Sequence, residues 1–94
     1  MKFEWDKKKN EINLQKHGIS FEEAKLIFNG PVLTSEDRKH SYGEVRKISV
    51  GEIENIVVVV VIHTKRGDNV RLISARKVNK KERELYYGYL KKKS

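Results

Sequence analysis

The sequence contains no cysteine and no apolar run long enough to cross a membrane. Without cysteine the chain has no disulfides, thiolate catalysis or cysteine-ligated zinc, and this composition is typical of a reducing cytosol. The longest apolar run, Ile56 to Ile62, is far shorter than the ~20 residues of a membrane-spanning helix. The N-terminal residues Met1 to Asp6 include two acids where a signal peptide would be apolar. We therefore expect a cytoplasmic protein with no membrane partner.

The familiar catalytic motifs are missing as well. The chain has no H-E-x-x-H or D-x-D motif, and His17, His40 and His63 have no partner at metal-ligand spacing. It also lacks a Walker loop, a dinucleotide fingerprint and a nucleophile elbow. We expect no metal and no cofactor, and find no support for serine catalysis or for nucleotide hydrolysis by the common routes.

Positive charge is what the sequence has in excess. It contains 21 Lys and Arg residues against 13 Asp and Glu residues, a formal net charge of +8 over 94 residues. Such a charge favours polyanionic partners, with nucleic acid first and an acidic protein second. The alternative is that the charge only keeps the protein soluble, and composition does not choose between these readings.

Two helices are predicted in the N-terminal third. Residues 6–17 are rich in helix formers, with Asp6 as the N-cap and Gly18 as the stop. The sequence from Ser20 to Glu23 then has the S-x-x-E spacing of a capping box, which predicts a second helix that ends at residues 29–31. The apolar residues at helical spacing in that second helix are expected to face the core, namely Phe21, Ala24, Ile27 and Phe28.

Strands are predicted from residue 32 onward, followed by one closing helix. The run Ile56 to Ile62 is β-branched at every position and predicts a central strand covered on both sides. Residues 42–50 and 70–76 predict its neighbours, residues 32–35 a short first strand, and residues 65–69 a turn. Asn79 can cap a last helix. The expected fold is a single α+β domain over residues 1–94, with two N-terminal helices, an antiparallel sheet of three or four strands, and helices against one face.

Several residues are candidates for chemistry, and each has a structural alternative. His17 sits beside Lys16 at a helix end, where it can act as a neutral base or simply cap carbonyl groups. Glu44 and Arg46, two apart on a strand, point to the same side, as an exposed ion pair or as a base beside a phosphate ligand.

Two arginines follow in the last predicted strand. Arg71 and Arg76 differ in parity, so an ideal strand presents both on one face only if Arg76 lies beyond its end. Arg76, flanked by small and apolar residues, is the stronger candidate for a phosphate or carboxylate partner. Tyr86 in the closing helix is by its spacing a core aromatic, or alternatively a base-stacking or proton-transfer group.

The order of these motifs resembles the BrnT family of bacterial toxins. The resemblance lies in Phe3-Glu4-Trp5-Asp6, Lys9, Asn13, Lys16-His17-Gly18 and the residues from Ser20 to Ala24, then in Gly43-Glu44-x-Arg46, Gly51, Arg66-Gly67, Arg71-x-Ile73-Ser74-Ala75-Arg76, Glu82-Arg83 and Tyr86. The resemblance implies a fold similar to RelE toxins, which cut RNA without metal. It also implies a BrnA-like antitoxin partner with a DNA-binding ribbon-helix-helix part.

With that resemblance, the candidate residues take provisional roles. Arg46 and Arg76 are expected to bind the scissile phosphate, His17 or Glu44 to act as base, and Tyr86 to stack a base or act as acid. Backbone contacts to RNA are expected from Lys16, Arg71 and Arg83. The alternative is a non-catalytic basic protein that acts with its antitoxin as a co-repressor on DNA.

Overall fold

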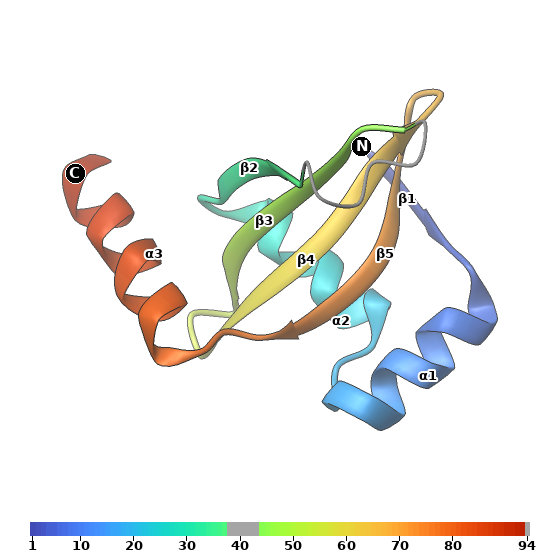
Figure 1. Ribbon diagram of the computed structural model, residues 1–94, viewed down its shortest axis with the longest axis horizontal. Helices are drawn as coiled ribbons and strands as arrows, with labels where there is room; N and C mark the ends of the chain where they lie inside the picture. The colour runs from blue at the N-terminus through green and yellow to red at the C-terminus, as the bar shows by residue number, and fades with distance from the viewer. Residues whose placement is uncertain (38–43, 94) are drawn as a thin grey trace.

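The computed structural model describes residues 1–37 and 44–93 (Figure 1). None of its helices is long and apolar enough to cross a membrane, within the part of the chain described. The elements follow in the order β1 (Lys2–Trp5), α1 (Lys7–His17), α2 (Phe21–Ala24), the 3-10 helix η1 (Lys25–Asn29), β2 (Leu33–Asp37), β3 (Arg46–Ile53), β4 (Val57–Arg66), β5 (Asn69–Lys77) and α3 (Lys80–Lys93).

The helix boundaries follow the capping signals in the sequence. The Asp6 carboxylate accepts from the Lys9 amide at 2.9 Å, and Gly18 ends α1 in the left-handed conformation with φ of 72°. The predicted capping box is present, because Ser20 and Glu23 each accept from the other's backbone amide. The second helix is confirmed in place, but only α2 is α-helical, and the chain tightens into η1 from Lys25.

The sheet has the strand order β1-β5-β4-β3-β2, so the valine-rich β4 is its central strand as predicted. β4 pairs antiparallel with β3 and with β5, and β2 pairs antiparallel with β3. The predicted turn after β4 is tighter than expected, with only residues 67 and 68 outside the strands. The predicted strand over residues 42–50 begins at Arg46, and its residues Tyr42 and Gly43 lie outside the described range.

The prediction of an antiparallel sheet of three or four strands was wrong. The sheet has five strands and is mixed, because β1 pairs in parallel with β5, from Lys2 opposite Asn69 to Trp5 opposite Leu72. β1 is only four residues long, too short for its apolar and polar alternation to stand out. The residues before α1 thus add an edge strand to the sheet.

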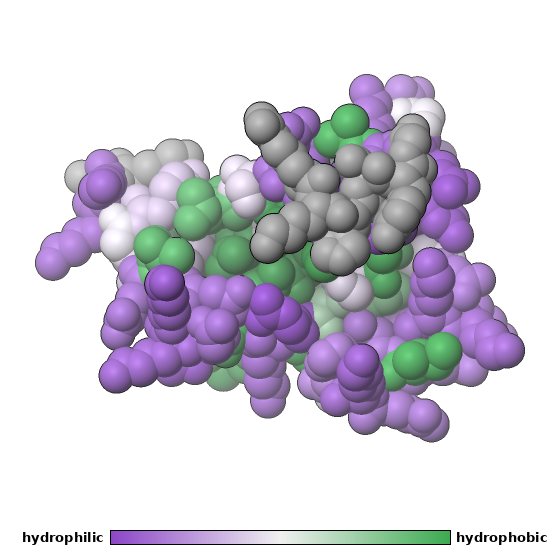
Figure 2. Space-filling model, viewed as in Figure 1, coloured by the Kyte–Doolittle hydropathy of each residue, from purple (hydrophilic) through white to green (hydrophobic). Residues whose placement is uncertain are grey.

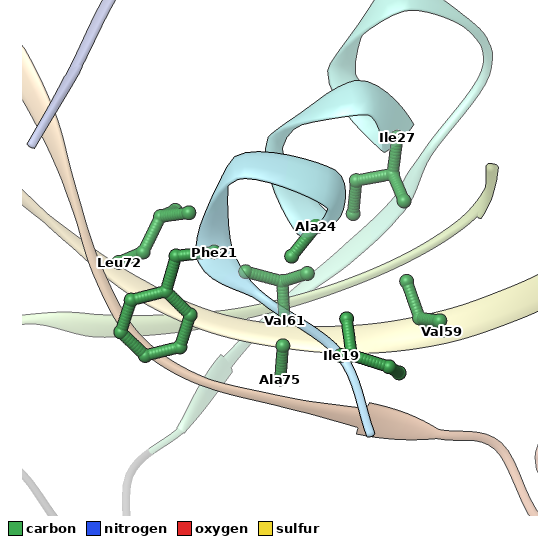
Figure 3. Close-up of a cluster of buried hydrophobic side chains, with 8 residues drawn as sticks. All are labelled: Ile19, Phe21, Ala24, Ile27, Val59, Val61, Leu72 and Ala75. Atoms are coloured by element: carbon green, nitrogen blue, oxygen red, sulfur yellow. The ribbon is translucent and has the colours of Figure 1, made fainter. Parts of the chain in front are cut away.

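The larger of two cores lies between the N-terminal helices and one face of the sheet. Phe21, Ala24 and Ile27 project from α2 and η1 toward valines of β4 (Figure 3). The full buried cluster is Ile19, Phe21, Ala24, Ile27, Val59, Val61, Leu72 and Ala75. Three of the four core residues predicted from helical spacing are fully buried, and Phe28 is packed against the cluster.

The prediction that all helices cover one face was also wrong. In Figure 1 α2 and η1 lie behind the strands, whereas α3 extends from the end of β5 at the left. Val58 and Val60 of β4 point away from the first core and form a second cluster with Val78 and Tyr86. α3 therefore packs against the opposite face of the sheet. Because both faces of β4 are covered, the valines on each face are buried.

Candidate functional site on the arginine face

A β-bulge in β5 changes which arginines share a face. The register with β4 shifts between Ile62 and His63: Ile62 pairs with Ser74 but His63 pairs with Leu72, so Ile73 is an extra residue. Leu72 and Ala75 consequently both face the first core, although their parity differs. Arg71 and Arg76 therefore share a face although Arg76 lies within the strand, because the ideal alternation behind the parity argument does not survive the bulge.

Arg46 projects to the same side, since Ile48 and Val50 of its strand belong to the second core. We call this side, opposite α2 and η1 and carrying Arg46, Arg71 and Arg76, the arginine face. Figure 2 looks onto it and shows hydrophobic residues gathered in the middle with hydrophilic residues around them. A side of the sheet that carries three arginines as well as apolar residues is suited to a ligand with both phosphates and flat bases.

Arg46 and Arg71 lie in a single row across the sheet. Thr64 pairs with Arg46 on one side and with Arg71 on the other, and the row continues to Glu4 and Asp37 at the sheet edges. With strands about 4.8 Å apart, the backbones of the two arginines lie about 10 Å apart. Arginine side chains are long enough to converge over Thr64 from that separation, so the row can hold one anion between two cations.

Each of these two arginines lies beside a carboxylate. The Arg46 Nε is 3.6 Å from Glu44 Oε1, which confirms that they approach each other, although Glu44 precedes the strand instead of lying in it. Arg71 donates through one terminal nitrogen to Glu4 at 2.8 Å. The pKa of Glu4 is lowered by hydrogen bonds from Asn69 first and Arg71 second, so this carboxylate is ionised at neutral pH. Arg71 keeps its other guanidinium donors available for a ligand.

Arg76 is held differently. Both of its terminal nitrogens donate to the Glu82 carboxylate, at 2.8 and 2.7 Å, in a two-pronged ion pair. The mutual hydrogen bond raises the pKa of Arg76 and lowers that of Glu82. Glu82 also accepts from the amide of Asn79 at 2.9 Å, and Asn79 caps α3 as predicted. Arg76 thus fixes the start of α3 to the sheet.

Tyr86 lies inside the second core. Its residue is 1% exposed, and its hydroxyl donates to the carbonyl of Pro31 at 2.9 Å. Burial is the largest cause that raises the pKa of the hydroxyl. This position matches the core role that the spacing favoured, and it leaves the ring no open face on which to stack a base.

The remaining predicted site residues lie elsewhere. His17 and Lys16 are at the end of α1, which packs along the edge of β5, where Asn13 bonds the backbone of Ala75, and not over the arginine face. Arg83 is exposed on α3. The structure therefore gathers Glu44, Arg46, Arg71 and Arg76 on one face and separates His17 and Lys16 from them.

A chain of polar side chains that runs from Thr34 at the surface to buried Ser49 and His63 was not predicted. The hydroxyls of Thr34 and Ser49 are 2.8 Å apart, and Ser49 is 2.7 Å from His63 Nε2. The ring of Phe28 packs edge-on against His63. Burial first, and the charge of Lys47 second, lower the pKa of His63 to about 4, so its ring is neutral at pH 7. Nothing in the spacing of these four residues indicates that the fold brings them together.

No metal centre is apparent in residues 1–37 and 44–93, where no cluster of three His, Cys, Asp or Glu side chains could hold an ion. The chemistry that the described side chains offer on the arginine face is anion binding by guanidinium groups, with carboxylates nearby to accept protons.

Comparison with known proteins places this arrangement in a family. The family model described as "Ribonuclease toxin, BrnT, of type II toxin-antitoxin system" matches residues 5–82. A crystal structure of the ribonuclease toxin BrnT from Brucella abortus superposes with a TM-score of 0.64 at 24% identity, covering 85% of this chain and 99% of that one. No protein of curated function matched the sequence. The chain belongs to the BrnT family of ribonuclease toxins of type II toxin–antitoxin systems.

Proposed function

We propose that this chain is a metal-independent endoribonuclease that binds the scissile phosphate of RNA on the arginine face. The observation that carries the proposal is the row in which Arg46 and Arg71 flank Thr64 on neighbouring strands. Two guanidinium groups converging on one position can stabilise the extra negative charge of a phosphorane without a metal. Membership of a ribonuclease toxin family supports the reaction type.

The geometry favours particular roles within this proposal. Cleavage requires a base that removes the proton from the 2′-hydroxyl, which then attacks the adjacent phosphorus and expels the 5′-oxygen. Glu44 is the better-placed base, because its carboxylate lies next to Arg46, whereas His17 ends a helix at the edge of β5, two strands away from β3. Arg71 moves from the backbone-tracking role predicted for it to phosphate binding, since it shares a row with Arg46.

Arg76 and Tyr86 are already engaged in bonds that hold α3 to the rest of the chain. Arg76 gives two of its hydrogen bonds to Glu82, so a phosphate there competes with that carboxylate, and Tyr86 can serve as acid only by leaving Pro31. We keep both as residues that support the reaction by holding α3 against the sheet. Lys16 and Arg83 are proposed to track the RNA backbone, with the salt dependence that counterion release produces.

An antitoxin is the expected protein partner, and we propose a BrnA-like ribbon-helix-helix protein whose complex with this chain binds operator DNA. One observation also supports a purely binding role on the same surface. Each arginine of the arginine face lies beside a carboxylate in the free chain: Arg46 beside Glu44, Arg71 beside Glu4, and Arg76 beside Glu82. A surface that accommodates carboxylates in this way is also complementary to an acidic partner.

Incubation with RNA in EDTA distinguishes the two roles. The wild-type chain should fragment total RNA with turnover, and Glu44→Gln should lower the rate by at least about 10-fold. His17→Ala should leave the rate near that of wild type, because α1 lies at the edge of β5, two strands away from Arg46 in β3. Intact RNA at every concentration of the wild-type chain would refute nuclease activity and leave the binding role. A large loss of cleavage rate in His17→Ala would instead show that His17 belongs to the catalytic site.

A further inference from the structure

A hollow outside the arginine face lies where the β3–β4 turn meets the start of α3. It has a volume of about 330 Å³ and is lined by Ile56, Val57, Val58, Lys77, Arg83 and Tyr87. Figure 1 shows the turn beside the first turns of α3, at the opposite end of β4 from the row of Arg46 and Arg71. We call it the α3 hollow.

The α3 hollow has the features of a site for a flat anionic ligand. Ile56 is 79% exposed and Tyr87 46% exposed, so aliphatic and aromatic surface remains uncovered there. Arg83 and Tyr87 are four residues apart on α3, which puts the guanidinium and the ring on the same side of the helix. Within the described residues neither Arg83 nor Lys77 makes a side-chain ion pair, and no acidic residue lines the hollow.

We propose that the α3 hollow is a subsite for a nucleotide of the RNA substrate, remote from the position of cleavage. A base would stack on Tyr87 above the aliphatic floor, while Arg83 and Lys77 bind the adjacent phosphates. The inference rests on the proposed function, since it takes RNA to be the substrate. It adds to that function a contact that selects for long, single-stranded RNA.

The position of the hollow fits a strand that leaves the arginine face. From Thr64 to Val58 the chain advances six positions along β4, about 20 Å at the usual rise of a strand. Arg76, opposite Val60, lies between the two places. A single strand bound at Arg46 and Arg71 can therefore pass Arg76 and reach the hollow, whereas a dinucleotide cannot span that distance. Binding at the hollow should accordingly affect long RNA only.

The test measures binding separately from cleavage. RNA of about 12 nucleotides with 2′-O-methyl groups has no attacking hydroxyl, so its affinity for the full chain can be measured by fluorescence anisotropy. Tyr87→Ala should weaken binding by about 10-fold, and Tyr87→Phe, which keeps the ring, should not. Arg83→Ala should weaken binding and reduce the slope of log affinity against log salt by about one. Leu85→Ala and Lys81→Ala, on α3 but outside the hollow, are the matched controls.

Cleavage assays complete the test. Tyr87→Ala should raise KM for a long RNA and leave both its kcat and the cleavage of a dinucleotide unchanged. Equal affinities for wild type, Tyr87→Ala and Leu85→Ala would overturn the subsite while leaving the nuclease intact. If Tyr87→Ala weakened the binding of an acidic antitoxin but not of RNA, the subsite would also be overturned, because the hollow would then be a protein contact. Failure of the wild type to bind RNA would overturn the subsite and the proposed function together.

Discussion

Asn13 makes three hydrogen bonds, and two of them join α1 to Ala75 of β5. Its amide donates to the carbonyls of Ile19 and Ala75, and its oxygen accepts from the Ala75 amide at 3.1 Å. The side chain is 6% exposed, so these bonds satisfy backbone groups that water does not reach. Asn13, which the sequence indicates only as one of the residues shared with the BrnT family, therefore has a structural role.

Replacing Asn13 should destabilise the protein strongly. Asn13→Ala leaves the amide and carbonyl of Ala75 without their partner, and the free energy of unfolding should fall by about 2–4 kcal/mol. Urea unfolding measures the change, with Gln15→Ala, exposed on the same helix, as the control. A loss no larger than that of the control would show that the three hydrogen bonds do not hold α1 in place.

His63 makes stability depend on pH. Its pKa is about 4 in the folded chain against 6.5 for the free side chain, so the unfolded chain binds the proton more readily. The free energy of unfolding should therefore decrease as pH falls from 6.5 toward 4, by about 2 kcal/mol between pH 7 and pH 5. His63→Gln should remove most of this decrease in urea unfolding measured at both pH values. An unchanged decrease in His63→Gln would assign the pH dependence to other groups.

At the scale of elements, η1 lies unusually close to the sheet at Gly51. A methyl group built on Gly51 would be 2.8 Å from the Ile27 Cβ and 3.0 Å from Val32 Cγ1. The absence of a side chain in β3 lets η1 and the segment that follows it approach the sheet directly. The apolar pattern of the second helix predicts that it packs on the core, but it does not indicate how closely.

Two glycine substitutions should change stability in opposite directions. Gly51→Ala forces η1 away from β3, and we expect a loss of about 1–3 kcal/mol. Gly88→Ala, within α3 and with open space around it, should gain up to about 1 kcal/mol from helix propensity. Thermal unfolding of the two variants beside wild type checks both signs. Equal small effects would mean that the contact at Gly51 relaxes without cost.

The elements also show where prediction from sequence succeeds and where it stops. Capping residues such as Asp6, Ser20 and Asn79 act through bonds within three residues, so the starts of the helices were predicted correctly. The five β-branched residues from Val57 to Val61 identified the central strand for the same local reason. β1 and the bulge at Ile73 depend on partners more than sixty and about ten positions away, so local patterns did not reveal them.

At the scale of the whole molecule, the candidate site was predicted only in part. Glu44 and Arg46 were paired correctly because they are neighbours in sequence. Arg71 was assigned a lesser role, because the parity argument assumes an unbroken strand and the bulge at Ile73 breaks it. His17 was grouped with the arginines because sequence alone does not show that α1 packs at the edge of β5 and away from β3.

The effect of the net charge of +8 on RNA cleavage must be separated from the effect of where the charged residues lie. Any basic surface attracts RNA, so a loss of activity on removing cations does not by itself identify a site. Arg46→Gln combined with Arg71→Gln lowers the net charge by two on the arginine face. Lys7→Gln combined with Lys8→Gln lowers it equally at the start of α1, whose exposed lysines lie beside the edge of the sheet and not on the arginine face. The two double variants therefore differ in position and not in charge.

The most direct test of the account is the rate at which these two double variants cleave RNA in EDTA, beside wild type and at equal salt. We predict a loss of at least about 100-fold for the variant of the arginine face and less than about 3-fold for the variant of α1. Circular dichroism should show that both variants fold. Equal losses, or retained activity in Arg46→Gln/Arg71→Gln, would contradict the claim that the arginine face is where RNA is cleaved.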